Sequence, residues 1–242
     1  MKENVFDQVA RDYEKIHNQW LPPGVPSAVF IHQRAARVTE WILSEYRGQK
    51  FCYLDFGCGN GRMLKCLLGS DPLKPMLSTG RLRLFGFDTS AESLNEARTL
   101  LYGEPVTLVN NWREFPRELR FDLVLSCHVF HHIPRIRRPK VVTSLHRWMK
   151  PASRLVIWEQ NPVNPITRLL VKLCPFDNDA RLLTMRATQA LLGQNGFRPI
   201  QSKYINLLPP RWLRSRWLVA IETQLLNFPI GAQYWVMFER HR

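Results

Sequence analysis

Three glycines at alternate positions, Gly57, Gly59 and Gly61, follow an apolar run that closes on Asp55. Glycine has no Cβ, so the backbone can turn sharply there and a ligand can lie directly against the main chain. In open α/β sheets, ligands bind beyond the carboxyl ends of the strands, which is where Asp55 falls. This spacing predicts a strand, a tight turn and a helix built around a small-molecule cofactor.

A second acidic side chain, Asp88, ends the next apolar run, in the place where a nucleoside-binding protein holds a ribose hydroxyl. Thr89 and Ser90 follow and can cap a helix over 90–101. A proline-rich loop over 69–80 makes the interval between the two aspartates longer than the common pattern. The alternative is that Asp88 is a turn residue and nothing more.

Four side chains near the end of a later strand, Cys127, His128, His131 and His132, are of the types that bind zinc. A second ligand pair at convincing spacing is missing from the rest of the sequence. We therefore predict no metal site, and interpret His131 and His132 as loop residues or as groups that orient a substrate.

These residues need a scaffold, and helix and strand patterns alternate along the chain. Helical spacing over 4–20 and 28–46 comes first, the second helix with Ser27 as a plausible cap. Strands are expected at 51–56, 82–88, 105–109, 121–127, 153–159, 198–207 and 233–238, and further helices at about 61–69, 90–101, 137–150 and 186–194. Such alternation predicts a parallel sheet covered on both faces.

Composition limits the protein class. The chain has 242 residues, 45% of them hydrophobic, which is enough to bury a core. No apolar run is long enough for a membrane span or a signal peptide, and the five scattered cysteines fit a reducing compartment, so we expect a cytoplasmic protein. The net charge of +14 attracts nucleic acid, anionic lipid or acidic metabolites.

Four segments in order resemble the motifs of class I S-adenosylmethionine-dependent methyltransferases, in particular the branch with ubiquinone and menaquinone biosynthesis enzymes. They are LDFGCGNGRML, FGFDTSAESLNEAR, FDLVLSCHVFHHI and LHRWMKPASRLVIWEQNP, and the similarity covers about residues 50–160. The resemblance implies an α/β fold with a Rossmann-like, doubly wound sheet of seven strands. That sheet is mostly parallel, with an antiparallel last strand and an N-terminal helical lid.

The resemblance also implies where S-adenosyl-L-methionine, the expected cofactor, binds. The turn would line its methionine and ribose side, and Asp88 would bind the ribose diol. Asn111 would hydrogen-bond the adenine and Trp112 would stack on it. The implied cofactor-binding residues are Asp55, Gly57, Cys58, Gly59, Asp88, Thr89, Asn111, Trp112, Ser126 and Cys127.

Methyl transfer mainly requires alignment of the acceptor with the sulfonium, since the leaving group is already activated. A general base helps where the nucleophile is a hydroxyl or an activated carbon. The candidates are His132, Glu159 and His17, although none has a spacing that singles it out and each has a structural alternative.

We predict a single domain over 1–242, with a helical lid at 1–48, a cofactor-binding core at 49–160, an inserted cap at 160–185 and a C-terminal helix and strand pair at 186–242. The apolar lid and cap favour O- or C-methylation of a small hydrophobic or lipid-linked acceptor. A basic segment over 209–226, rich in arginine and tryptophan, suits peripheral contact with an anionic membrane, and the alternative is a helix that lies on the core with solvated arginines. The alternatives are an RNA or protein methyltransferase and a non-catalytic regulatory protein.

Overall fold

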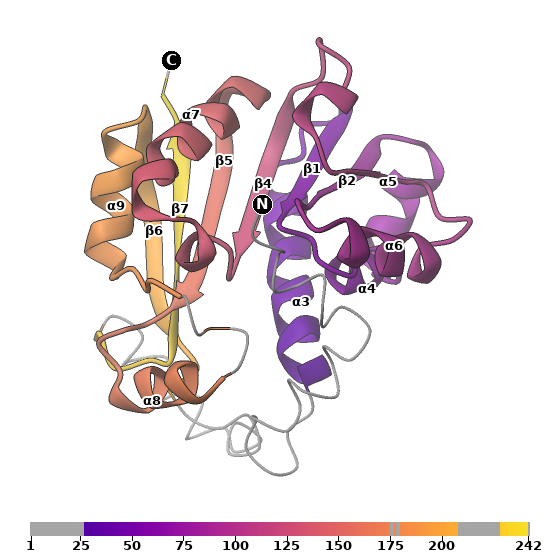
Figure 1. Cartoon of the computed structure of the whole chain (residues 1–242). Helices are drawn as coiled ribbons and strands as arrows, with labels where there is room; N and C mark the ends of the chain where they lie inside the picture. Colours follow the sequence, from indigo (N-terminus) through magenta and orange to yellow (C-terminus); the bar gives the residue numbers. More distant parts are fainter. Residues whose placement is uncertain (1–26, 175–176, 178–179, 208–227, 242) are drawn as a thin grey trace. The chain divides into compact units, whose positions relative to one another are not determined.

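The computed structural model describes residues 27–174, 177, 180–207 and 228–241 (Figure 1). The chain divides into two compact units, residues 1–124 and 125–242, and each is described by itself. The helix expected over 4–20, with His17, and the basic segment over 209–226 lie outside the described residues.

The described part of the chain forms a seven-stranded sheet in the order β3-β2-β1-β4-β5-β7-β6. Strands β1 to β3 are parallel, whereas β7 is antiparallel to both β5 and β6. The predicted α/β, Rossmann-like class with an antiparallel last strand is confirmed. The strands are β1 (Phe51–Phe56), β2 (Leu82–Phe87), β3 (Val106–Val109), β4 (Phe121–Cys127), β5 (Met149–Gln160), β6 (Phe197–Ile205) and β7 (Gln233–Arg240).

The described helices are α3 (Ser27–Glu45), α4 (Arg62–Leu68), α5 (Lys74–Ser78), α6 (Ala91–Leu100), α7 (Arg138–Trp148), α8 (Pro165–Leu173) and α9 (Met185–Gly193). Five of them, α3, α4, α6, α7 and α9, fall close to the predicted ranges, whereas α5 and α8 were not predicted as helices. Single 3-10 turns are η1 (Asp71–Leu73), η2 (Trp112–Glu114), η3 (Phe130–His132) and η4 (Arg135–Arg137). Within the described residues, no helix combines the length and the apolar character needed to cross a bilayer.

In the first unit, strand register brings the predicted cofactor residues to one edge of the sheet. β1 is buried along its whole length, as expected for a strand in the interior of a parallel sheet. Phe56 pairs with Phe87, and Phe87 pairs in turn with Val109, so β1, β2 and β3 end at the same level. The residues that follow these three strands are therefore neighbours in space.

The segment over 69–80 differs from the loop that its prolines suggest. It contains η1 and α5, each with a proline in its first turn, where the missing N–H breaks no helical hydrogen bond. Leu73 and Met76 are buried and hold the segment against the core.

In the second unit, β5 and β7 form a long antiparallel pair that runs from Arg154 opposite Glu239 to Gln160 opposite Gln233. Helix α9 packs on β6 and β7 and contacts α7 (Figure 1). Glu159 lies near the end of β5 directly opposite Tyr234, and both side chains are fully buried. A polar cluster is thus built into the apolar interior of this unit.

Candidate active site

The glycine turn after β1 is tied to the end of β2 by backbone hydrogen bonds. The amides of Gly57 and Cys58 both donate to the carbonyl oxygen of Phe87, at 2.7 and 3.1 Å. Gly57 and Gly59 have φ values of 81° and 51°, in the left-handed region that glycine adopts without a steric penalty. A Cβ at Gly59 would meet no atom within 4 Å, so the turn leaves open space above that residue.

Asp88 connects this turn to the helix that follows β2. One carboxylate oxygen accepts a hydrogen bond from the amide of Gly59 at 2.8 Å, and the other accepts from the amide of Ser90 at 2.9 Å. Ser90 caps α6, since its hydroxyl accepts a hydrogen bond from the amide of Ser93. Of the two predicted capping residues, Thr89 and Ser90, the second is therefore confirmed. The side chain of Thr89 is exposed. Asp88 therefore shapes the turn by joining the amide of Gly59 to the start of α6.

Asp55 is almost completely buried, with 3% of its surface exposed. Burial, together with repulsion from Asp88, raises the pKa of its carboxyl to about 7, although Arg34 opposes the shift. A buried carboxyl at the end of a strand, beside a second carboxylate, favours a cationic or hydrogen-bonding ligand. Cys58 is also buried, and a Cβ at Gly86 would lie 2.8 Å from its Sγ, so only its backbone is placed to serve a ligand in the turn.

Three aromatic rings stack at the same edge of the sheet. Trp112 lies 4.4 Å from Phe87, centroid to centroid, with an interplanar angle of 19°, and Phe56 is stacked on Phe87 at 5.4 Å. Asn111 forms a capping box with Glu114, in which its side-chain oxygen accepts from the amide of Arg113. The side-chain oxygen of Asn111 is thus already engaged, whereas Trp112 extends the apolar platform next to the turn.

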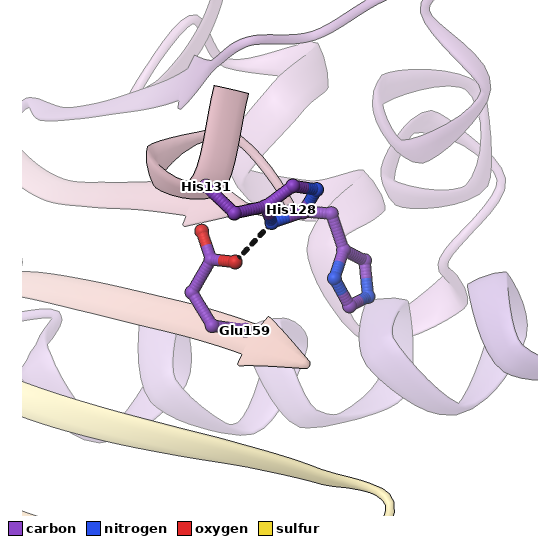
Figure 2. A group of neighbouring side chains, drawn as sticks. All are labelled: His128, His131 and Glu159. Atoms are coloured by element: carbon purple, nitrogen blue, oxygen red, sulfur yellow. Dashed lines mark hydrogen bonds and ion pairs between the residues drawn. The ribbon is translucent and has the colours of Figure 1, made fainter. Parts of the chain in front are cut away.

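In the second unit, Glu159 is a fully buried carboxylate with several hydrogen-bond donors. One oxygen accepts from the amides of Val129 and Phe130, at 3.1 and 2.8 Å. The other pairs with Nδ1 of His131 (Figure 2). These contacts suit a residue that positions the loop after β4, rather than one that takes a proton from an acceptor.

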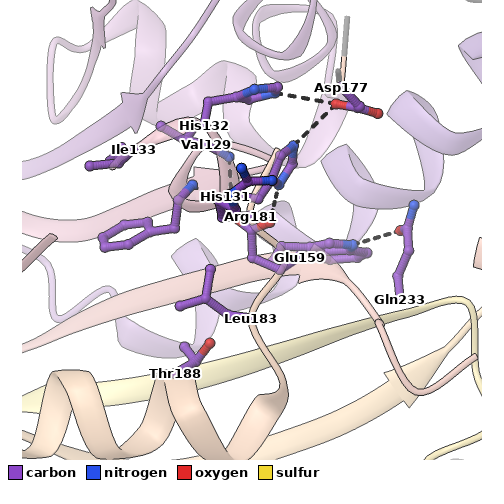
Figure 3. Close-up of polar contacts among 12 residues, drawn as sticks. Val129, His131, His132, Ile133, Glu159, Asp177, Arg181, Leu183, Thr188 and Gln233 are labelled. Carbon is purple, nitrogen blue, oxygen red and sulfur yellow. Dashed lines mark hydrogen bonds and ion pairs between the residues drawn. The ribbon is translucent and has the colours of Figure 1, made fainter. Parts of the chain in front are cut away.

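His131 and His132 converge on Asp177 (Figure 3). The Nε2 atom of His131 is 3.5 Å from Oδ1 of Asp177, and Nε2 of His132 is 3.4 Å from the same oxygen. Burial disfavours the charged ring of His131, but Glu159 and Asp177 more than offset it and raise its pKa to about 10. Burial would raise the pKa of Asp177, yet the two histidines hold it below its usual value.

Further contacts lock this cluster in place. Arg181 donates its amide to the carbonyl oxygen of His131 at 2.8 Å, and Arg138 donates to the carbonyl oxygens of Ile133 and Arg181. Tyr234 donates its hydroxyl to Leu183 at 3.0 Å. The segment over 180–183 is therefore held against the loop that carries the histidines.

The predicted site residues fall into two groups. Asp55, Gly57, Cys58, Gly59, Asp88, Thr89, Asn111 and Trp112 gather in the first unit, whereas Ser126, Cys127, His132 and Glu159 belong to the second. Ser126 is fully buried at the end of β4, and its hydroxyl has no hydrogen-bond partner among the described residues. His17 lies outside the described residues.

Asp177 and Arg138 are part of the histidine cluster, although the sequence does not single them out. Asp177 lies in a segment without periodicity, PFDNDA, far along the chain from the histidines. Arg138 belongs to the run PRIRRPK, where it looks like one of several solvated charges, yet only 5% of its surface is exposed. The available signal in the sequence is Pro139, which predicts that a helix starts at this point and so places Arg138 in its first turn.

The comparisons with known proteins agree with the resemblance in the motifs. Residues 54–157 match the family described as a methyltransferase domain. A protein of Encephalitozoon cuniculi that is named as a methyltransferase is 27% identical over 125 residues, which are 50% of this chain and 50% of that protein. The chain thus spans about half the length of this curated relative.

Solved structures share the fold at low sequence identity. A chain from the Haloferax volcanii complex between the Trm112 methyltransferase activator and a methyltransferase has a TM-score of 0.63 at 13% identity, with full coverage of both chains. The magnesium protoporphyrin IX methyltransferase of Synechocystis, solved with S-adenosylhomocysteine, has a TM-score of 0.61 at 17% identity, covering 99% of this chain and 100% of that one. With the strand order and the turn after β1, residues 54–157 are a methyltransferase domain of the class I, S-adenosylmethionine-dependent type.

Proposed function

We propose that this enzyme binds S-adenosylmethionine at the turn after β1 and transfers the methyl group to a small hydrophobic or lipid-linked acceptor. The observation that carries the cofactor assignment is the turn itself. Asp88 fixes the amide of Gly59, Asp55 lies buried beside it, and the space above Gly59 is open. In this assignment Asp55 faces the cationic methionine end, Asp88 takes the ribose hydroxyls and Trp112 supports the adenine.

The chemistry asks for positioning more than for proton transfer. The cofactor supplies a methyl group on a positively charged sulfur, and the protein aligns the acceptor and excludes water. Of the three predicted bases, we propose that Glu159 acts by positioning, because its oxygens already bind two amides and His131. The side chain of His132 is 18% exposed, so of the proposed bases in this cluster it is the one nearest to solvent.

The raised pKa of Asp55 gives a test of the cofactor site. In the folded protein without cofactor, this carboxyl is protonated at pH 6, because its pKa lies near 7. A cation bound beside it favours the carboxylate, so cofactor binding should release close to one proton at pH 6 and almost none at pH 8.5. Calorimetry in two buffers of different ionisation enthalpy measures this release.

The matched variant is Asp55→Asn, which cannot release a proton. It should bind the cofactor more weakly, with the same apparent enthalpy in both buffers. Binding by the unchanged protein at pH 6 with buffer-independent enthalpy would place the cofactor away from Asp55.

The exposed apolar side chains of helix α8 favour a hydrophobic acceptor that the enzyme takes from a membrane surface. Ile166, Leu169, Leu170 and Leu173 are spaced at i, i+3, i+4 and i+7, and their exposed fractions are 67%, 57%, 40% and 49%. The opposite side of the helix is fastened by polar contacts: Thr167 donates to the carbonyl oxygen of Ala232 at 3.0 Å. An amphipathic helix with its apolar stripe facing outward suits insertion into a lipid interface.

Charge next to this stripe favours anionic lipid. Arg168 and Lys172 are exposed on the same helix, and Phe228 and Ile230 add exposed apolar surface. Asn164 donates to the carbonyl oxygen of Ile230 at 2.6 Å, so the two apolar segments are neighbours. Basic side chains beside an apolar stripe add electrostatic attraction to the burial of apolar area.

The double variant Ile166→Ser, Leu169→Ser should therefore lose at least about tenfold in partitioning to vesicles with anionic lipid, since each buried apolar side chain contributes roughly 1.5–3 kcal/mol. Sedimentation with sucrose-loaded vesicles measures the bound fraction. Tyr102→Ser is the matched control, because Tyr102 is 91% exposed in the other unit. Equal binding by both variants, or salt-sensitive binding to RNA with none to vesicles, would favour a polymer acceptor instead.

A further inference from the structure

We propose that His131, His132 and Asp177 form a binding site for a divalent first-row transition metal ion, with Zn²⁺ as the representative probe. The three ligand atoms lie within 4.8 Å of one another. They come from η3 and from a residue in a distant segment, and Figure 3 shows both imidazole rings directed at one carboxylate. This inference goes beyond methyl transfer and does not depend on the proposed acceptor.

The distances between the histidine nitrogens and Asp177 are those of two ligands that share one ion, and they are long for hydrogen bonds. Nε2 of His131 and Nε2 of His132 are 3.5 and 3.4 Å from Oδ1 of Asp177. Nitrogen–oxygen hydrogen bonds have distances of about 2.7–3.2 Å, so both contacts are long. Two ligands of tetrahedral zinc, each about 2.0–2.2 Å from the metal, are separated by about 3.3–3.5 Å. The observed separations match that value.

The supporting contacts are those of a metal-binding histidine. Nδ1 of His131 pairs with Glu159, which leaves Nε2 as the metal-facing nitrogen. Histidine ligands generally donate their second ring N–H to a carboxylate, which fixes the tautomer and the ring orientation. Glu159 is itself held by the amides of Val129 and Phe130. The orientation of His131 is thus determined before a metal arrives.

Among the described residues, the group His128, His131 and Glu159 also brings three possible metal ligands together. Both oxygens of Glu159 already accept hydrogen bonds, as Figure 2 and the backbone contacts show, so this group is the less suitable one.

The burial pattern indicates an open coordination position. Only 2% of the His131 side chain is exposed, whereas His132 and Asp177 are 18% and 15% exposed. Three protein ligands at the edge of the cluster leave a fourth position for water or another oxygen ligand, as in zinc sites that take part in chemistry. The absence of a second ligand pair in the sequence disfavours zinc, but the fold supplies the third ligand from Asp177.

The test is metal binding by the full chain, purified without a histidine tag and freed of metal. After dialysis against Zn²⁺, the unchanged protein should retain one equivalent by mass spectrometry of the metal. Co²⁺ should give the absorption of a tetrahedral nitrogen and oxygen site. His132→Gln and Asp177→Asn should each weaken the affinity at least about tenfold.

His241→Gln is the matched control, since His241 is exposed and outside the cluster. It should bind metal like the unchanged protein, and Cys174→Ser tests for a thiolate ligand. Thermal unfolding without metal checks that the variants fold. Retention of full affinity by both His132→Gln and Asp177→Asn, or the loss of binding only in Cys174→Ser, would overturn the proposal. Either result leaves the assignment of the methyl-transfer site intact, because no cofactor is present in the assay.

Discussion

Replacing Glu159 with alanine should lower the free energy of unfolding by about 3–5 kcal/mol, the largest stability effect that we expect for a single substitution. The variant removes the carboxylate that pairs with Nδ1 of the buried His131, and it removes the acceptor of two backbone amides. Unpaired buried donors cost about 1–3 kcal/mol each, so the loss exceeds that of an ordinary ion pair. Urea unfolding followed by tryptophan fluorescence measures the change.

Glu239→Ala is the matched control in the same unit. Glu239 pairs with Arg154 and Arg198, but its side chain is 23% exposed, so water screens the interaction. Its removal should cost less than about 1 kcal/mol. Similar losses of stability in the two variants would show that the buried contacts of Glu159 contribute no more than an exposed ion pair. Glu159→Gln should recover part of the stability, because its amide oxygen still accepts a hydrogen bond from a backbone N–H.

Replacing Asp88 with alanine should raise the Kd for S-adenosylhomocysteine at least about thirtyfold, which corresponds to roughly 2 kcal/mol. Two effects add. In the proposed assignment the ribose loses a charge-assisted acceptor, and the amides of Gly59 and Ser90 lose the side chain that fixes the turn. Calorimetry with the product measures the affinity, without interference from turnover.

Asp71→Ala is the control, since it removes the same charge from an exposed position in the same unit, where Asp71 pairs with Lys74. It should change the Kd by less than about twofold. If Asp88→Ala also bound the product with nearly unchanged affinity, the ribose assignment would be wrong. Asp88→Asn keeps the shape of the side chain and removes its charge. It should also lower the pKa of Asp55, because the negative charge of Asp88 no longer repels the Asp55 carboxylate.

Much of the fold follows from periodicity and from glycine, serine and proline positions. Strand β4 falls at the predicted residues, and α6 begins after Ser90, because alternation and capping are local properties of the sequence. The ends of β5 were predicted less well. The strand starts at Met149 rather than near 153, since its pairing with β7 and its burial are tertiary effects.

The site was harder to predict, because its roles depend on contacts between distant segments. Glu159 looks like a candidate base when only its place at a strand end is known, and its two amide donors in the loop after β4 appear only in the structure. Asp177 joins His131 and His132 through the fold alone. Trp112 was expected to meet adenine, and its stacking on Phe87 depends on strand register, which no local pattern encodes.

The single carbonyl of Phe87 that accepts both Gly57 and Cys58 has a consequence for kinetics. Together with the carboxylate of Asp88, it fixes the shape of the turn through hydrogen bonds within the protein. Little chain entropy then remains to be lost when a nucleoside arrives, and the association rate should be governed by diffusion and electrostatic attraction instead of loop ordering.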